Sequence, residues 1–286
     1  MTEISRWTAG LGLGAFFFVL IAAEYLRPLR PPVEPKPRRL ARNGTLAGVW
    51  LAALAALQTP LLDAATRWAG EHRFGLLHLV TLPRAAQVVV ALLLFDYTLW
   101  FWHWANHRIP FLWRFHVVHH VDLDLDGSTA LRFHVGEMLM SAPYRAAQAL
   151  LIGADVASVN LFQLVLMASI LFHHSNVGFP YAIERRLVRF VVTPRMHGIH
   201  HSTHRGETDS NYSSFLSAWD YLHRTVRLNV PQAEIRIGVP AYVDVEEVTL
   251  PKLLSLPFRR QRAYWVGLSA PPPRPPTDAP PTKLLP

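Results

Sequence analysis

Three long apolar runs constrain the fold of this chain more than any other feature. They lie at about 9–26, 44–65 and 82–101 of the 286 residues, and 51% of the whole sequence is hydrophobic. A helix needs roughly 20 apolar residues to cross a bilayer. The sequence therefore predicts an all-α, multi-pass membrane protein in which each run crosses the membrane as a helix.

A fourth apolar stretch, 135–173, is expected to form a helical hairpin that turns near Gly153. Arg145, Gln148 and Asp155 make it more polar than the first two runs, so it either crosses the membrane or dips in and returns. Both arrangements leave its two ends on the same side. The expected fold thus has about four or five spans or re-entrant segments, with a cytoplasmic helical cap that carries the histidine motifs described below.

The loop between the first two runs sets the expected orientation. Six basic residues fall between Arg27 and Arg42, and loops rich in lysine and arginine stay in the cytoplasm. We therefore expect 103–134 and 173–204 in the cytoplasm and the N-terminus outside. The first run lacks a clear cleavage site, which favours a retained anchor over a signal peptide. The Ala/Arg-rich composition is typical of a GC-rich bacterial genome, so a bacterial inner membrane is expected.

Histidines are concentrated in one part of the chain, since twelve of the fifteen lie between 103 and 204. "FHVVHH" and "MHGIHH" share the spacing H-x-x-H-H, and "HWANH" has H-x-x-x-H. On a helix each set projects from one face, where several imidazoles suit neither a core nor lipid but do suit a metal ion. The three motifs hold eight histidines, too many for one ion, so two ions are expected at His103, His107, His116, His119, His120, His197, His200 and His201.

Composition and motifs exclude several metal chemistries. The chain has no cysteine, which excludes thiolate zinc sites and iron–sulfur clusters, and it lacks the zincin motif H-E-x-x-H. Zinc, copper, iron and nickel all accept imidazole, and iron suits a paired centre that activates dioxygen. A histidine-rich metal transporter is the alternative, although its ligands should lie mid-span. A bis-histidine haem carrier would need histidines that face each other across helices.

Several acidic and amide side chains are candidates to orient these ligands through hydrogen bonds. Asp96 lies two helical turns before the first histidine motif, and an ionisable group inside a membrane points to a functional role. Glu137, Asp209 and Asp220 are weaker candidates for the same role, and Asn211 is expected to shape the loop after the last motif. "DLDLDG" (122–127) looks like the start of an EF-hand loop, but Phe133 stands where the bidentate glutamate is required.

The order of these motifs resembles the fatty acid hydroxylase/sterol desaturase superfamily of integral-membrane di-iron oxygenases. The resemblance covers about 90–225 and is specific to the superfamily rather than to a substrate. It is carried by "DYTLWFWHWANH" (96–107), "FHVVHH" (115–120), "TALRFHVGE" (129–137), "HHSN" (173–176), "TPRMHGIHH" (193–201) and "DSNYSSFLSAWD" (209–220).

The resemblance implies two further ligands, His134 and His174, with His174 preferred to His173. It also implies two iron ions, dioxygen as co-substrate, and hydroxylation or desaturation of a fatty-acyl, sterol-like or other lipid, with ether cleavage left open. Ser169 stands where some members carry a further histidine, which argues against the fatty-acid 2-hydroxylase branch. Electrons must come from a separate reductase, ferredoxin or cytochrome b5-like carrier, because no Rossmann fingerprint, flavin domain or haem domain fits in the chain.

These features divide the chain into four expected regions. N-terminal membrane anchor helices occupy 1–85, and the di-metal oxygenase domain occupies 86–230. A peripheral segment, 231–270, is followed by a proline-rich tail, 271–286, that is expected to be disordered. The net charge of +8 accompanies no nucleic-acid-binding motif, so no nucleic-acid partner is expected.

Overall fold

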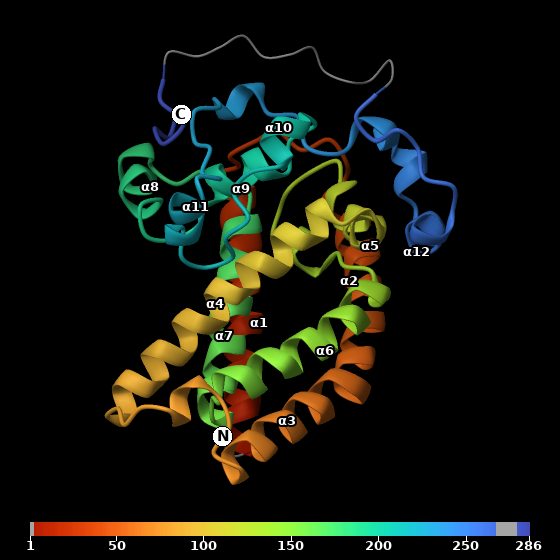
Figure 1. The fold of residues 1–286 in the computed structure, drawn as a ribbon. Helices are drawn as coiled ribbons and strands as arrows, with labels where there is room; N and C mark the ends of the chain where they lie inside the picture. The colour runs from red at the N-terminus through yellow and green to blue at the C-terminus, as the bar shows by residue number, and fades with distance from the viewer. Residues whose placement is uncertain (1–2, 267–278) are drawn as a thin grey trace.

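The computed structural model describes residues 3–266 and 279–286, and within them the chain is helical, with three isolated β-bridges and no strand. The predicted all-α class is confirmed (Figure 1). The helices are α1 (Glu3–Leu26), α2 (Lys36–Ala53), the π-helical η1 (Leu54–Gln58), α3 (Thr59–Glu71), α4 (Arg84–Arg108), α5 (Pro110–His120), α6 (Val135–Ile152), α7 (Val156–His174), α8 (Tyr181–Leu187), α9 (Pro194–His200), α10 (Arg205–Thr208), α11 (Ala218–His223) and α12 (Leu250–Ser255). Short 3-10 turns are η2 (Leu76–His78), η3 (Thr129–Leu131), η4 (Gln232–Glu234), η5 (Pro240–Tyr242), η6 (Val245–Val248) and η7 (Leu256–Phe258).

Four helical segments of the described chain are long and apolar enough to cross a membrane: Thr8–Leu26, Lys36–His78, Arg84–Arg108 and Val156–His174. Three of them coincide with the predicted apolar runs. Helix α1 leaves Phe18 71% and Leu26 82% exposed, as expected for side chains that face lipid rather than a protein core. The protein is therefore an integral membrane protein with several spans.

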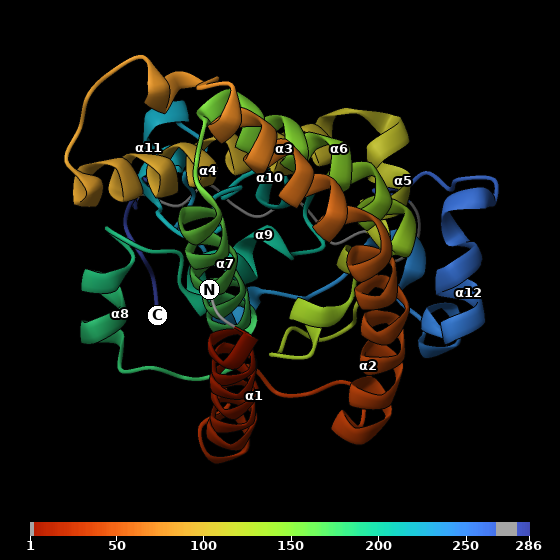
Figure 2. The same cartoon turned by 90° about the horizontal axis from the view of Figure 1, so that it is seen from below.

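The second span is longer than the sequence indicated, because it continues from α2 through η1 into α3. Figure 1 shows the helix axis changing direction near η1. A π-helical turn inserts an extra residue into the helical repeat and is a common origin of such bends. The bend lays α3 beside α6, which the two views in Figures 1 and 2 both show.

The predicted hairpin over 135–173 is formed by α6 and α7, and its turn lies at Gly153 as expected. Gly153 ends α6 in the left-handed conformation (φ 71°), which glycine adopts without a steric penalty. Asp155 begins α7 by accepting a hydrogen bond from the Ser158 N–H at 2.8 Å. Helix α7 has the length and hydropathy of a span, and it packs against α1 and α4.

Gly75 lies where the α3–α4 loop touches this turn. Its φ is 107°, and a Cβ there would lie 2.4 Å from the Gly153 nitrogen. We therefore expect Gly75→Ala to lower the free energy of unfolding by about 2 kcal/mol or more, because both backbone strain and a backbone clash oppose it. Thermal unfolding in detergent, followed by circular dichroism, measures the effect.

The matched control for this prediction is Gly70→Ala. Gly70 lies inside α3, and a Cβ there meets nothing within 4 Å. It should be neutral or stabilising by up to about 1 kcal/mol, since alanine favours a helix. Equal melting temperatures for the two variants would show that the α3–α4 loop does not need the close approach.

Helices α8 to α11 and the last residues of the chain gather at one end of the spans, opposite the N-terminus (Figure 1). Residues 267–278, the end of the peripheral segment and the first part of the expected tail, lie outside the described residues. Residues 279–286 are described and pack on this cap: Leu284 is 2% exposed against Val188, Met196 and Leu228. The cap thus closes over the ends of α4 and α7, where the histidines lie.

Candidate metal centre

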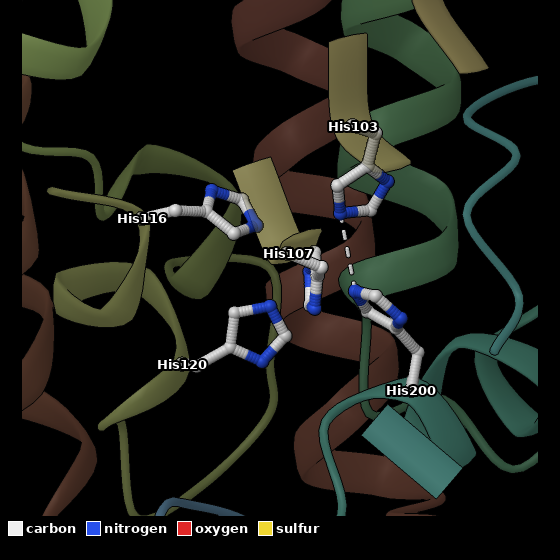
Figure 3. Close-up of side chains that lie close together, drawn as sticks. All are labelled: His103, His107, His116, His120 and His200. Atoms are coloured by element: carbon white, nitrogen blue, oxygen red, sulfur yellow. Dashed lines mark hydrogen bonds between the residues drawn. The ribbon is translucent and has the colours of Figure 1, made fainter. Parts of the chain in front are cut away.

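Nine histidines converge at the cap end of the spans as two adjacent groups. Within each group, one ring nitrogen per residue lies within 4.8 Å of the others. The ring centroids of His120 and His201, which belong to different groups, are 4.3 Å apart. The five-histidine group, drawn in Figure 3, is His103, His107, His116, His120 and His200. The four-histidine group is His119, His174, His197 and His201.

In each H-x-x-H-H motif, the first and third histidines join one group and the middle histidine joins the other. In α5, His116 and His120 are one turn apart and join the five-histidine group, whereas His119 joins the other. In and just after α9 the assignment is reversed, because His200 joins the five-histidine group and its two neighbours join the other. Each motif therefore reaches both groups, and the i, i+4 pairs, which lie on one helix face, stay together.

The local sequence places α9 and α5 at the required positions. Thr193 begins α9 by accepting a hydrogen bond from the Met196 N–H, and Pro194 occupies the first helical position. Pro110 likewise begins α5. Both helices are short, so their histidines lie close to a helix end and can reach residues of neighbouring segments.

Unsatisfied ring nitrogens fit a bound cation in both groups. Both ring nitrogens of His107 and the Nε2 atoms of His116 and His120 are buried without a hydrogen-bond partner. The Nε2 atoms of His174 and His197 are 3.0 Å apart, and those of His103 and His200 are 3.1 Å apart. Buried nitrogens without partners are costly. A metal ion in each group would satisfy them, and an all-imidazole donor set suits zinc, copper, iron or nickel.

The protonation states also suit metal ligation. Burial lowers the pKa of His200 to about 3. Burial likewise lowers the pKa values of His120, His197 and His201 well below their usual range. At neutral pH these rings are uncharged and each keeps a lone pair, as a ligand requires.

Hydrogen bonds to the second ring nitrogen fix the orientation of several histidines. When Nδ1–H donates to an oxygen, the Nε2 lone pair is left for a metal, and the ligand becomes more basic. Five rings make such contacts: His103 to the Tyr212 carbonyl (2.7 Å), His200 to Ser210 (2.6 Å), His174 to Ile170 (2.8 Å), His119 to Arg132 (3.2 Å) and His116 to the Glu137 carboxylate (2.9 Å).

The carboxylates and the amide named from the sequence lie in different places. Glu137 contacts a ligand ring, as above, and an Asp209 oxygen lies 4.0 Å from Nδ1 of His107. The Asp96 carboxylate accepts hydrogen bonds from the Leu216 N–H at 3.0 Å and from the Trp219 indole at 2.7 Å. Asn211 shapes the loop, as expected, by donating to two carbonyl oxygens.

Asp220 holds the loop that orients His103. Its carboxylate accepts hydrogen bonds from the N–H groups of Tyr212 and Ser213, both at 2.9 Å, and from the Trp100 indole at 3.1 Å. This fixes the Tyr212 carbonyl that accepts from His103. The sequence signal for this role is the position of Asp220 at the end of the "DSNYSSFLSAWD" motif.

His134 and His173 lie beside the two groups rather than in them. The Nδ1 atom of His134 accepts from the Gly136 N–H at 2.9 Å and so caps α6, while its Nε2 lies 3.1 Å from the Leu254 carbonyl. The ring of His173 lies 4.2 Å from that of His197. The geometry brings His174, the preferred member of the pair, into the four-histidine group.

A buried ion network explains the "DLDLDG" stretch without calcium. Arg39 of α2 pairs with Asp122 at 2.8 Å and with Asp126. Burial alone would raise the pKa of Asp122, but the Arg39 and Arg132 guanidiniums hold it well below its usual range. Arg132 donates to the Val118 carbonyl of α5, and its own carbonyl accepts from His119. The network therefore connects α2 to the metal-facing side of α5.

A cavity of about 210 Å³ leads to the histidines from the membrane-spanning part. Its walls come mainly from η1, α4, α6 and α7, and most of its surface is apolar. Phe95, Leu99, Phe162 and Leu166 line it away from the cap. At the cap end the lining side chains include His103, His116, His119, His173, His174 and His197.

The Glu137–His116 contact leads to a test of metal affinity. Glu137→Gln removes the carboxylate charge that holds the His116 ring through its Nδ1 atom, so metal affinity at the five-histidine group should fall about 10-fold or more. Competition with a chelator measures it. Glu247→Gln, which changes a peripheral carboxylate paired with Arg262, should leave affinity unchanged. Equal affinity in both variants would mean that Glu137 does not tune the site.

This combination of apolar spans and clustered histidines defines a helical membrane protein with a candidate two-metal centre. A family model described as fatty acid hydroxylase matches residues 88–225. That region of the chain, which holds all nine grouped histidines, matches the fatty acid hydroxylase family, and the resemblance noted in the sequence is confirmed.

Curated relatives include several lipid-modifying enzymes. Cholesterol 25-hydroxylase of Rattus norvegicus is 27% identical over 163 residues, covering 57% of this chain and 54% of the relative. Ornithine lipid hydroxylase OlsE of Rhizobium tropici is 30% identical over 161 residues, covering 56% and 48%. Alkylglycerol monooxygenase of Homo sapiens is 30% identical over 130 residues, covering 46% and 28%. The chain thus spans about half the length of its first relatives, and no solved structure matches it significantly.

Proposed function

We propose that this protein is a membrane-bound, O2-dependent oxidoreductase that uses two iron ions to hydroxylate or desaturate a lipid. One observation carries the proposal: two adjacent histidine groups lie at the end of an apolar cavity. The relatives named as lipid hydroxylases or monooxygenases support it. The pairing of the groups favours chemistry that needs two metal ions acting together.

Different residues of the chain would bind the metal ions and the lipid substrate. The five-histidine group and the four-histidine group would each hold one iron ion, with His134 kept as a candidate near them. When bound, the iron pair supplies an oxidant strong enough to attack an unactivated C–H bond. The apolar wall formed by Phe95, Leu99 and Phe162 would bind the hydrocarbon and exclude water. Asp220 and Glu137 would keep the histidine rings oriented.

The overall balance requires an external reductant. Hydroxylation consumes the lipid, O2, two electrons and two protons, and yields the alcohol and water; desaturation yields the alkene and two waters. The two electrons must reach the site from a donor. A reductase, ferredoxin or cytochrome b5-like carrier is therefore proposed as the electron donor.

Contacts between the basic loop and the cap support a cytoplasmic position for the histidines. Arg30 donates to the Gln232 side chain, and Arg39 pairs with Asp122 next to the histidines of α5. The Arg27–Arg42 loop and the histidine motifs therefore share one side of the membrane, and the positive-inside rule assigns that side to the cytoplasm. For a bacterial source, the inner membrane is the proposed location.

A metal transporter is the alternative, and the placement of the ligands disfavours it. His103 and His107 lie in the last turns of α4, and His174 is the last residue of α7. A transport site should lie near the middle of the spans. Here the ligands lie in and under the cap.

Comparison of lipid extracts tests the proposed activity. Cells that express the protein should contain a lipid species with one oxygen gained or two hydrogens lost, relative to cells with an empty vector, as measured by mass spectrometry. The new species should disappear under anaerobic growth. Identical lipid profiles in an iron-replete host that supplies a working electron donor would contradict the proposal.

A further inference from the structure

The cavity is long, and its two ends differ chemically. Glu137, which contacts His116, marks the cap end on α6, and Arg145 lines the cavity eight residues further along the same helix. At 1.5 Å per residue this separates them by about 12 Å. On α7 the lining likewise runs from Val159 and Phe162 to His174. Along both helices, the lining therefore runs from histidines at one end of the cavity toward Arg145 at the other.

Arg145 is an unusual side chain for this position. It is the one arginine or lysine among the described residues that line the cavity. Its guanidinium carbon lies 5.9 Å from the ring centroid of Phe162, and Phe162 stacks on Phe95 at 5.0 Å. The one carboxylate in the lining, Glu137, is already engaged by His116. Within the described part of the chain, no carboxylate pairs with Arg145.

A cation without an anionic partner in an apolar cavity is costly and points to a function. An arginine that served only to solubilise a surface would extend toward the headgroups, whereas this one lines the cavity that leads to the histidines. Uncharged polar side chains, Gln58, Ser141 and Gln163, line the same cavity. The Ser141 hydroxyl donates to the Gln58 side chain at 3.3 Å. These groups can complete the hydrogen bonds of an anionic headgroup.

We propose that Arg145 binds the anionic group of the lipid substrate, a carboxylate or a phosphate, while the hydrocarbon extends to the histidines. A guanidinium forms charge-assisted, bidentate hydrogen bonds with either group. The apolar wall between the two ends suits a hydrocarbon chain. The substrate class is then an acyl lipid with an acidic group rather than a neutral sterol. This inference rests on the proposed function for its reaction but not for its binding.

The separation of the two ends also defines where the lipid is oxidised. With the acidic group at Arg145, a carbon about 12 Å away along α6 reaches the cap end. Oxidation is therefore expected at a methylene several carbons from the acidic group, and a product oxidised at the adjacent carbon would contradict this arrangement.

Three lipids with the same tail test the binding. Dodecanoate, dodecyl phosphate and dodecanol differ only in a carboxylate, a phosphate or a neutral head. Binding to purified full-length protein in neutral-lipid nanodiscs is measured by calorimetry, without reductant, so that no turnover occurs. We expect one or both anions to bind about 10-fold or more tightly than the alcohol, and the stronger of the two identifies the headgroup chemistry.

Variants assign the preference to Arg145. Arg145→Met should abolish the preference for the anions and leave dodecanol binding intact, which also shows that the variant is folded. Arg145→Lys should keep part of the preference. Arg67→Met, an exposed position on the neighbouring α3, should keep all of it.

Two results would overturn the proposal. One is wild-type protein that binds neither anion more tightly than dodecanol, an outcome that does not depend on any variant. The other is an undiminished preference in Arg145→Met. The proposed oxidation can fail separately, because lipid extracts with no modified species would leave these binding constants unchanged.

Discussion

Replacing His200 by alanine is expected to abolish lipid modification and to remove metal from the five-histidine group. The Nε2 atom of His200 lies 3.1 Å from that of His103, and its Nδ1 donates to the Ser210 carbonyl at 2.6 Å. Loss of an outer-shell partner typically reduces activity or metal affinity 10- to 100-fold, so loss of a ligand should exceed about 100-fold. Mass spectrometry of lipid extracts and metal analysis of the purified variant measure the two effects.

His204→Ala is the matched control for this prediction. His204 lies in the same stretch, "MHGIHHSTH", but outside both histidine groups. Its replacement should leave the metal content and the lipid product close to those of the wild type. A persistent product in His200→Ala would show that His200 is not an essential ligand, whatever the behaviour of the control.

The second large effect is expected for Asp122→Asn. Asp122 is fully buried and pairs with Arg39 at 2.8 Å, with Arg42 at 3.5 Å and with Arg132 at 3.6 Å. Neutralising it leaves buried guanidiniums without their shared partner, and breaking such a pair typically costs about 3–5 kcal/mol. Unfolding in mixed micelles, followed by circular dichroism, should show a loss of this size.

Asp155→Asn makes the same chemical change at an exposed ion pair. Arg84 and Asp155 have side chains 56% and 41% exposed, and such pairs contribute about 0–1 kcal/mol. Asparagine also keeps the cap at the start of α7. Similar losses of stability in Asp122→Asn and Asp155→Asn would contradict the importance assigned to the buried network.

Periodicity and length predicted the spans and the hairpin because these depend on local sequence. The apolar runs and the glycine at 153 were sufficient for that. The continuation of the second span through η1 to α3 was not expected, since the prediction ended at residue 65 and more polar residues follow. There α3 packs against α6, and this tertiary contact is invisible in a single stretch of sequence.

The grouping of the histidines was easier to predict than the contacts around them. Nine of the ten predicted ligands come together in two groups, because their helical spacing and motif order carried the signal. The position of His134 at the N-cap of α6 depends on the local backbone, which spacing does not reveal. The bond from Asp96 to Trp219 and the pair between Arg39 and Asp122 join residues about 120 and 80 positions apart, so neither was predictable from one sequence.

Metal content is the most direct test of the central claim that the two histidine groups form a di-iron centre. The full-length protein should be purified anaerobically from iron-replete cells and its metals measured per chain. We predict about two iron ions per chain, falling in His200→Ala but not in His204→Ala. Protein that is folded by circular dichroism and yet contains no bound metal would contradict the claim.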